Sequence, residues 1–79
     1  MTEHTLETIR AYADATWNEA REIVANFFGT PDRGAAWMLA LSDEAALPAR
    51  VADAMRRAFD ALNAKEAAEF KARYANTSF

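Results

Sequence analysis

The stretch TLETIRAYADATWNEAREIVANFFGTP, from Thr5 to Pro31, decides the fold. Its apolar residues recur at intervals of three or four, which places them on one face of an α-helix. These residues are Leu6, Ile9, Ala13, Trp17, Ala20, Val24 and Phe27. Gly29 follows as a residue that can adopt a positive φ, and Pro31 prevents continuation of the helix. The sequence therefore predicts a long first helix from Thr5 to Phe28 with one continuous apolar stripe.

A short second helix is expected next. Thr30 serves as its N-cap with Pro31 at the first helical position, and the helix ends near Leu41. Residues 35–41, AAWMLAL, are apolar all round, so this segment is either central in the fold or covered by a partner. We favour burial within the monomer, with neighbouring helices wrapped around a central strut. Pairing of the segment across the two-fold axis of a homodimer is the alternative.

The remainder of the chain predicts two more helices and one extra turn. Ser42 is a second N-cap, which opens at least a single turn before Pro48. Pro48 then begins a third helix that runs to about Leu62. Asn63 and Glu66 have the spacing of a capping box, so Asn63 ends that helix and caps a last one.

The composition also indicates an all-α fold. Alanine, the strongest helix former, occurs twenty times, and no segment alternates with the period of two that a strand requires. Two Trp, two Tyr and five Phe residues supply bulk for a core made otherwise of small side chains. We expect a single helical domain over residues 1–79, folded as a compact all-α bundle of four to five helices with a long N-terminal helix.

Length and residue types exclude several functional classes. A chain of 79 residues has no room for the doubly wound sheets and barrels that carry many enzymes. Cysteine is absent, and the one histidine, His4, lies near the N-terminus without a Glu-x-x-His partner. We therefore expect no catalytic residues, no metal and no cofactor. Neither a signal peptide nor a membrane-spanning stretch is visible, so the expected location is the cytoplasm.

Charge is distributed unevenly along the chain. The net charge of −3 has the wrong sign for attraction to phosphates, so direct binding of nucleic acid is not expected. Residues 1–44 contain eight acidic and three basic residues, and residues 45–79 contain four acidic and six basic ones. Several of the later bases have an acid at helical spacing, as Lys65 has Glu69, which predicts a self-neutralised face.

Four of the acids among the first 22 residues form one arc of the first helix and its N-terminal extension. On a helical wheel they share roughly 100° opposite the apolar stripe. They are Glu3, Glu7, Asp14 and Glu22. Such an arc fits a protein partner with a basic groove, including a nucleic-acid-binding host complex. A solvated outer face, with Arg10 and Arg21 flanking the acids, is the alternative interpretation.

Phe28 is the fifth candidate partner-binding residue. Adjacent helical residues lie about 100° apart, so Phe27 takes the centre of the apolar stripe and Phe28 takes its edge. At that edge Phe28 either closes the core beneath the turn between the first two helices or joins an exposed apolar patch for a partner or a second copy.

Two resemblances bear on function. The chain resembles the toxin-binding domain of Xre/MbcA/ParS-type antitoxins, which has Phe-Gly, Ala-x-x-Trp-Leu and Leu-Gly-x-x-Pro in that order. The similar residues here are Phe28-Gly29, Ala36-Trp37-Met38 and Leu47-Pro48. The Gly-x-x-Pro loop of that family is absent here. In length, acidity and helix-rich composition, the whole chain is similar to small phage proteins that act against host machinery. Anti-CRISPR proteins are the best-known group of these, and they share no motif.

These observations predict a non-catalytic, protein-binding inhibitor that occludes or remodels a macromolecular partner, of the anti-CRISPR kind. The alternative is an antitoxin or regulatory module that neutralises a cognate toxin. Either protein would work as a monomer or a homodimer.

Overall fold

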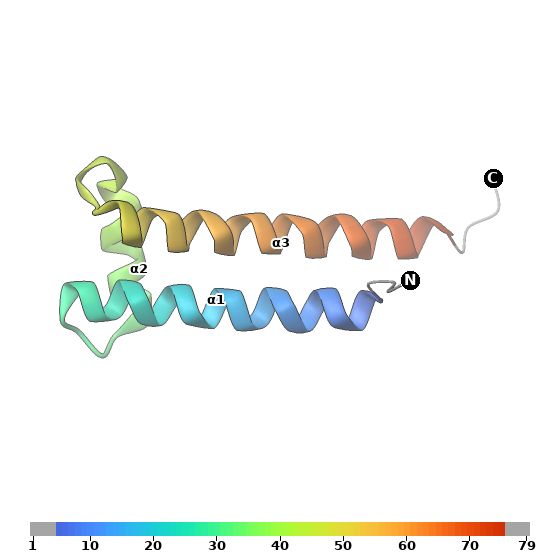
Figure 1. The fold of residues 1–79 in the computed structure, drawn as a ribbon, viewed down its shortest axis with the longest axis horizontal. Coiled ribbons are helices and arrows are strands. Elements are labelled where there is room, and N and C mark those ends of the chain that lie inside the picture. Colours follow the sequence, from blue (N-terminus) through green and yellow to red (C-terminus); the bar gives the residue numbers. More distant parts are fainter. Residues whose placement is uncertain (1–4, 76–79) are drawn as a thin grey trace.

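The computed structural model describes residues 5–75 as three α-helices and one turn of 3-10 helix. In chain order they are α1 (Leu6–Phe28), α2 (Arg33–Ser42), η1 (Glu44–Ala46) and α3 (Ala49–Ala75). No strand occurs in this part of the chain, so the predictions of an all-α fold and a long N-terminal helix are confirmed. α1 and α3 lie antiparallel, and α2 crosses one end of the pair (Figure 1).

The molecule is an elongated helical hairpin rather than the compact bundle expected. Its principal extents are 49 × 27 × 21 Å. α2 has only 10 residues and covers the end where α1 finishes and α3 begins, which we call the closed end. At the other end, the open end, α1 and α3 have no third helix beside them (Figure 1). The predicted four to five helices are therefore too many, because the described residues form three.

α1 begins and ends where the sequence predicts. The side-chain oxygen of Thr5 accepts a hydrogen bond from the backbone N–H of Thr8 at 3.2 Å, as an N-cap does. Gly29 has a φ of +69°, and its N–H donates to carbonyl groups of the last turn of α1. Glycine adopts this left-handed conformation without the steric cost of a Cβ atom, and it ends the helix.

The boundaries of α2 differ from the prediction. Asp32, not Thr30, is the N-cap, because its carboxylate accepts from the N–H of Ala35 at 3.0 Å and also interacts favourably with the helix dipole. The Thr30 hydroxyl instead accepts from the N–H of Asp32 and holds the preceding turn. Ser42 is the last residue of α2 rather than an N-cap, and its hydroxyl donates to the carbonyl of Leu39. The single turn predicted after it is present as η1.

α3 continues through Asn63, where the sequence predicted a boundary between two helices. It begins directly after Pro48 and runs for 27 residues. Asn63 is exposed, and an exposed amide that points to solvent does not compete with the backbone hydrogen bonds of its helix. Before Asn63, Phe59 contacts Trp17 of α1, and after it, Lys65 pairs with Asp14 of α1, so both halves of α3 pack against the same helix.

The core consists of small side chains around three aromatic rings. The ring centroids of Trp17 and Trp37 lie 4.8 Å apart, and that of Phe59 lies 6.2 Å from Trp17 and 5.9 Å from Trp37. Their tilted and edge-on arrangements are those that aromatic pairs favour. One ring comes from each helix, so this aromatic cluster joins all three. The buried residues around it include Ala20, Val24, Ala25, Ala36, Ala40, Val51, Ala54, Met55 and Ala58.

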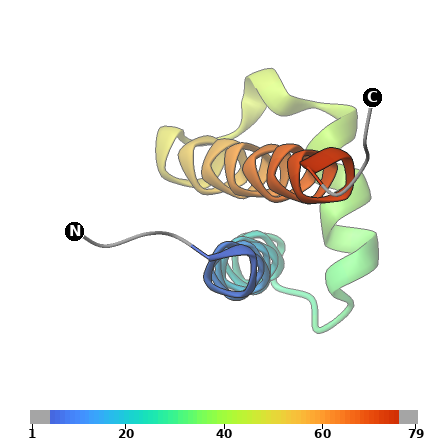
Figure 2. The same cartoon turned by 90° about the vertical axis from the view of Figure 1, so that its right-hand side faces the viewer.

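The segment 35–41 is buried on one side only. Its inward residues are Ala36, Trp37 and Ala40, and its exposed large residues are Met38, Leu39 and Leu41. Trp37 is 8% exposed, whereas Met38 is 67% exposed. α2 is therefore not a strut wrapped by its neighbours, because it lies against one side of the α1–α3 pair, as the view along the helices shows (Figure 2).

We predict that Trp37→Ala lowers the free energy of unfolding by about 3–5 kcal/mol, because it removes one ring of the aromatic cluster. Urea unfolding followed by circular dichroism measures the loss. The control is Met38→Ala on the exposed side of the same helix, which should cost less than about 1 kcal/mol. Equal losses would contradict the burial pattern of α2.

We also predict that Asn63→Ala raises the free energy of unfolding by about 0.5 kcal/mol, because alanine is the better residue inside a helix. A capping Asn63 would give the opposite sign, with a loss of about 1 kcal/mol. Asn18→Ala, at an exposed position inside α1, is the matched control and should also be stabilising. Thermal unfolding of the two variants decides between these models.

Candidate interaction surfaces

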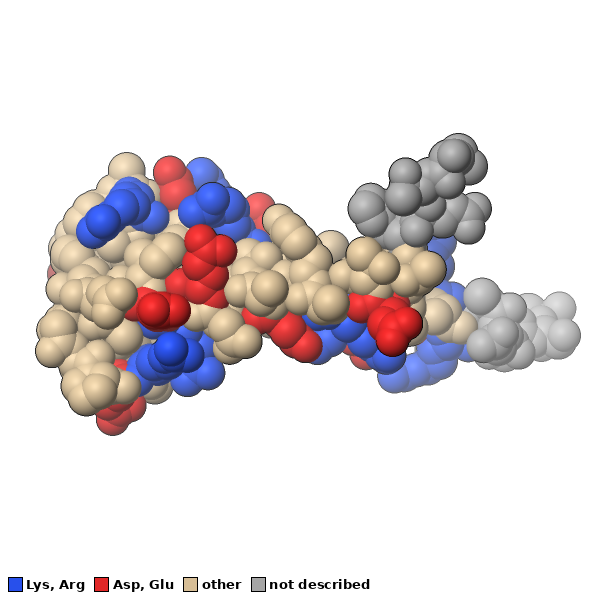
Figure 3. Space-filling view, turned by 60° about the horizontal axis from the view of Figure 1, so that its bottom comes forward, with Lys and Arg blue, Asp and Glu red and all other residues tan. Residues whose placement is uncertain are grey.

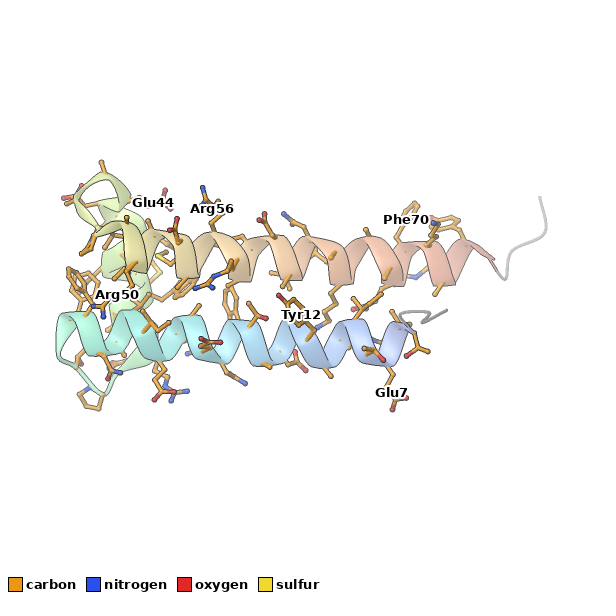
Figure 4. The ribbon with its side chains drawn as sticks, viewed as in Figure 1. Glu7, Tyr12, Glu44, Arg50, Arg56 and Phe70 are labelled. Atoms are coloured by element: carbon orange, nitrogen blue, oxygen red, sulfur yellow. The ribbon has the colours of Figure 1, made fainter. Side chains whose placement is uncertain are left out.

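The first candidate surface is the acidic face of α1, which we define by Glu7, Asp14 and Glu22. All three are exposed. Glu7 points away from α3 (Figure 4). From Glu7 to Glu22 the helix rises by about 22 Å, so the carboxylates form a row of that length on one rigid element. Glu3, predicted to continue the row, lies outside the described residues, as does His4.

Two ion pairs join the edge of this face to α3. Lys65 Nζ lies 4.0 Å from Asp14 Oδ1, and Arg10 Nη2 lies 3.5 Å from Glu69 Oε2. The sequence predicted that Lys65 pairs with Glu69 within one helix, but each instead contacts a residue of α1. Residue spacing within α3 cannot predict ion pairs between α3 and α1. The Asp14 side chain remains 73% exposed, so its carboxylate is still accessible to a partner.

The surface around α1 has charges of both signs. In Figure 3, Asp and Glu side chains spread along the length of the molecule, with Lys and Arg side chains among them. Within α1 the acids Glu7, Asp14, Glu19 and Glu22 outnumber the bases Arg10 and Arg21. Because Arg10 is paired with Glu69, its positive charge offsets the acidic face less than the sequence alone indicates.

Phe28 lies at the edge of the core. It is partly buried and packs against the buried cluster, while the neighbouring Phe27 is 41% exposed. The two rings contact each other edge-on, with centroids 4.9 Å apart. The expectation that Phe27 takes the centre of the stripe is therefore wrong. Phe28 packs against a cluster that includes residues of α2, and the wheel of α1 by itself does not include that neighbour.

The second candidate surface is a hollow next to the aromatic cluster that the sequence reasoning missed. It has a volume of about 290 Å³. Its lining residues are Glu44, Leu47, Ala52, Met55, Arg56 and Phe59. Glu44 and Arg56 lie on the same side of α3 (Figure 4), and Arg56 also donates a hydrogen bond to Asp53 at 2.8 Å. The mainly apolar lining suits one apolar side chain of a partner.

Among residues 5–75, no group of three or more His, Cys, Asp or Glu side chains is placed to hold a metal ion. No helix in the same range has the length and apolar character needed to cross a bilayer.

Comparison with known proteins finds no match to a family model, a curated protein or a solved structure. The resemblances therefore rest on residues and composition alone. The antitoxin-like residues have roles in this fold, because Gly29 caps α1, Trp37 belongs to the aromatic cluster and Leu47 packs against the core.

Substitution of Phe27 and of Phe28 tests which of the two rings packs against the core. We predict that Phe28→Ala lowers the free energy of unfolding by about 2 kcal/mol, because the ring contacts the core. Phe27→Ala, the same change one residue away, should cost less than Phe28→Ala. Urea unfolding of both variants gives the comparison, and a larger loss for Phe27 would contradict the placement of Phe28.

Proposed function

We propose that this protein is a non-catalytic inhibitor that binds a protein partner through the acidic face of α1 and covers a basic surface of that partner. The observation that carries the proposal is the row of exposed carboxylates of Glu7, Asp14 and Glu22 along about 22 Å of one helix. Such a row offers the Lys and Arg side chains of a partner negative charges in place of phosphates. A nucleic-acid-binding host complex is a partner of this chemistry.

Rigidity favours this mode of binding. α1 is held along its length by α3 and near its middle by the aromatic cluster, to which it contributes Trp17. Its carboxylates therefore need little backbone rearrangement to meet a partner, which lowers the entropy cost of association.

Anti-CRISPR proteins are the group to which the chain is similar in length, acidity and helix content. The first partner to test is therefore a purified CRISPR surveillance complex. A cytoplasmic location belongs to the same proposal, and the absence of cysteine is compatible with a reducing compartment.

We predict that Glu7→Lys combined with Glu22→Lys weakens binding to the partner by at least about tenfold and reduces the salt dependence of binding. Both residues are exposed, so the free energy of unfolding should change by less than about 1 kcal/mol. Asp14 is left unchanged because a base at that position would lie beside Lys65. Biolayer interferometry at several salt concentrations measures both effects.

The matched control is Asp60→Lys combined with Glu66→Lys, two exposed residues of α3. Both double variants have the same net charge, so a difference between them reports position rather than total charge. Equal loss of affinity in both would refute a role for the acidic face. Binding to the product of a neighbouring toxin gene, and not to the surveillance complex, would support the antitoxin alternative. Turnover of a small substrate would contradict both proposals.

A further inference from the structure

A shallow furrow runs along the seam between α1 and α3, on the side opposite α2. It consists of three adjoining hollows. The hollow nearest the closed end contains Glu19 and Arg57, and it shares Tyr12 with the middle hollow. The middle hollow shares Ile9 and Ala64 with the third, which extends to Leu6. On α1 the furrow extends from Ile23 to Leu6, a length of about 25 Å. In Figure 2, α2 lies on one side of the α1–α3 pair, and no helix of the described residues covers the other side.

Side chains of different size face each other across this furrow. Tyr12 of α1 is 64% exposed, a high value for a large aromatic residue, and it lies between the two helices in Figure 4. The residues across from it on α3 are the small Ala61 and Ala64. The α1 rim is therefore raised and the α3 rim is low at the same level of the hairpin.

The two rims also have opposite charges. Glu19 of α1 and Arg57 of α3 line the same hollow, which places them at the same level along the hairpin. Both are exposed, and neither takes part in an ion pair with another residue of the described range 5–75. At this level of the hairpin, the negative charge thus belongs to the α1 rim and the positive charge to the α3 rim.

We propose that this furrow is filled by a second copy of the chain, in a dimer whose two-fold axis runs parallel to the helices. Such an axis sets α1 of each copy against α3 of the other at the same level. Glu19 of one copy then faces Arg57 of the second copy, and this contact occurs twice. Tyr12 covers the small alanines of the second copy. The face is complementary to itself in both charge and side-chain size.

The area of the face agrees with a reversible dimer. Two adjacent helices, each about 10 Å across, over a length of about 25 Å offer roughly 500 Å² per copy. This falls in the class of small, transient interfaces, below the roughly 800 Å² per partner of a standard complex. The dimer is therefore expected to dissociate on dilution.

The inference is independent of the proposed function. Glu7 of the acidic face points away from α3, so dimerisation through the furrow leaves it accessible (Figure 4). The exposed residues of α2 are a competing site for self-association, but Met38, Leu39 and Leu41 include no pair of opposite charges to fix a register.

The test uses sedimentation of the full chain at concentrations up to about 1 mM, which covers weak association. The unmutated chain should show a monomer–dimer equilibrium. Glu19→Arg and Arg57→Glu should each weaken the dimer at least about tenfold, because both symmetry-related contacts then join like charges. An equimolar mixture of the two variants should restore the dimer, since each contact again joins opposite charges.

Rescue by mixing identifies the contact as intermolecular. Within either variant chain, positions 19 and 57 have the same sign of charge, and mixing does not alter this. Both positions are exposed, so circular dichroism should show the unmutated helix content in each variant. Met38→Glu is the control on α2 and should leave the dimer unchanged. The proposal is overturned if the unmutated chain is monomeric throughout, if the mixture shows no rescue, or if only Met38→Glu removes the dimer.

Discussion

The contact of Trp17, Trp37 and Phe59 is the interaction on which the rest of the structure depends. Most other buried residues are alanines, which let α1 and α3 approach closely but each remove little apolar surface from water. The three rings supply much of the missing area at one point, where each of the three α-helices contributes one. Without them, α2 would keep only two buried alanines, Ala36 and Ala40, as fully enclosed contacts.

This concentration of the core at the closed end determines which surfaces are available for binding. At the open end, α1 and α3 form a two-helix layer without a third helix, and two surface ion pairs add little stability. Local opening is expected to be easier there than around the rings. A second copy in the furrow would add apolar contacts to this thin end, as small folds commonly do by oligomerising. The acidic face of α1 would be held more firmly as a consequence.

Much of the fold could be predicted from sequence because its signals are local. The spacing of apolar residues, the Thr5 cap and Gly29 together define α1. The helix boundary predicted at Asn63 was wrong. Its spacing to Glu66 matches a capping box, but contacts of α3 with α1 favour a continuous helix through this position. The helical wheel of α1 alone was enough to predict that Glu7, Asp14 and Glu22 are exposed. Three features could not be predicted in this way, because they depend on where neighbouring helices lie and a wheel describes one helix alone. They are the placement of Phe28, the hollow near Glu44 and the furrow.

The pairing of α1 with α3 raises the question of what fixes its register, since alanine surfaces slide past one another at little cost. The rings fix it near the middle of the hairpin, and charge selects it from there toward the open end. In the observed register Arg10 meets Glu69 and Asp14 meets Lys65. A shift of α3 by one turn would bring Arg10 opposite Lys65, and a shift the other way would bring Asp14 opposite Glu69. Each ion pair adds less than about 1 kcal/mol to the stability of the fold. Together the two pairs disfavour both neighbouring registers, so their main contribution is to the specificity of helix pairing.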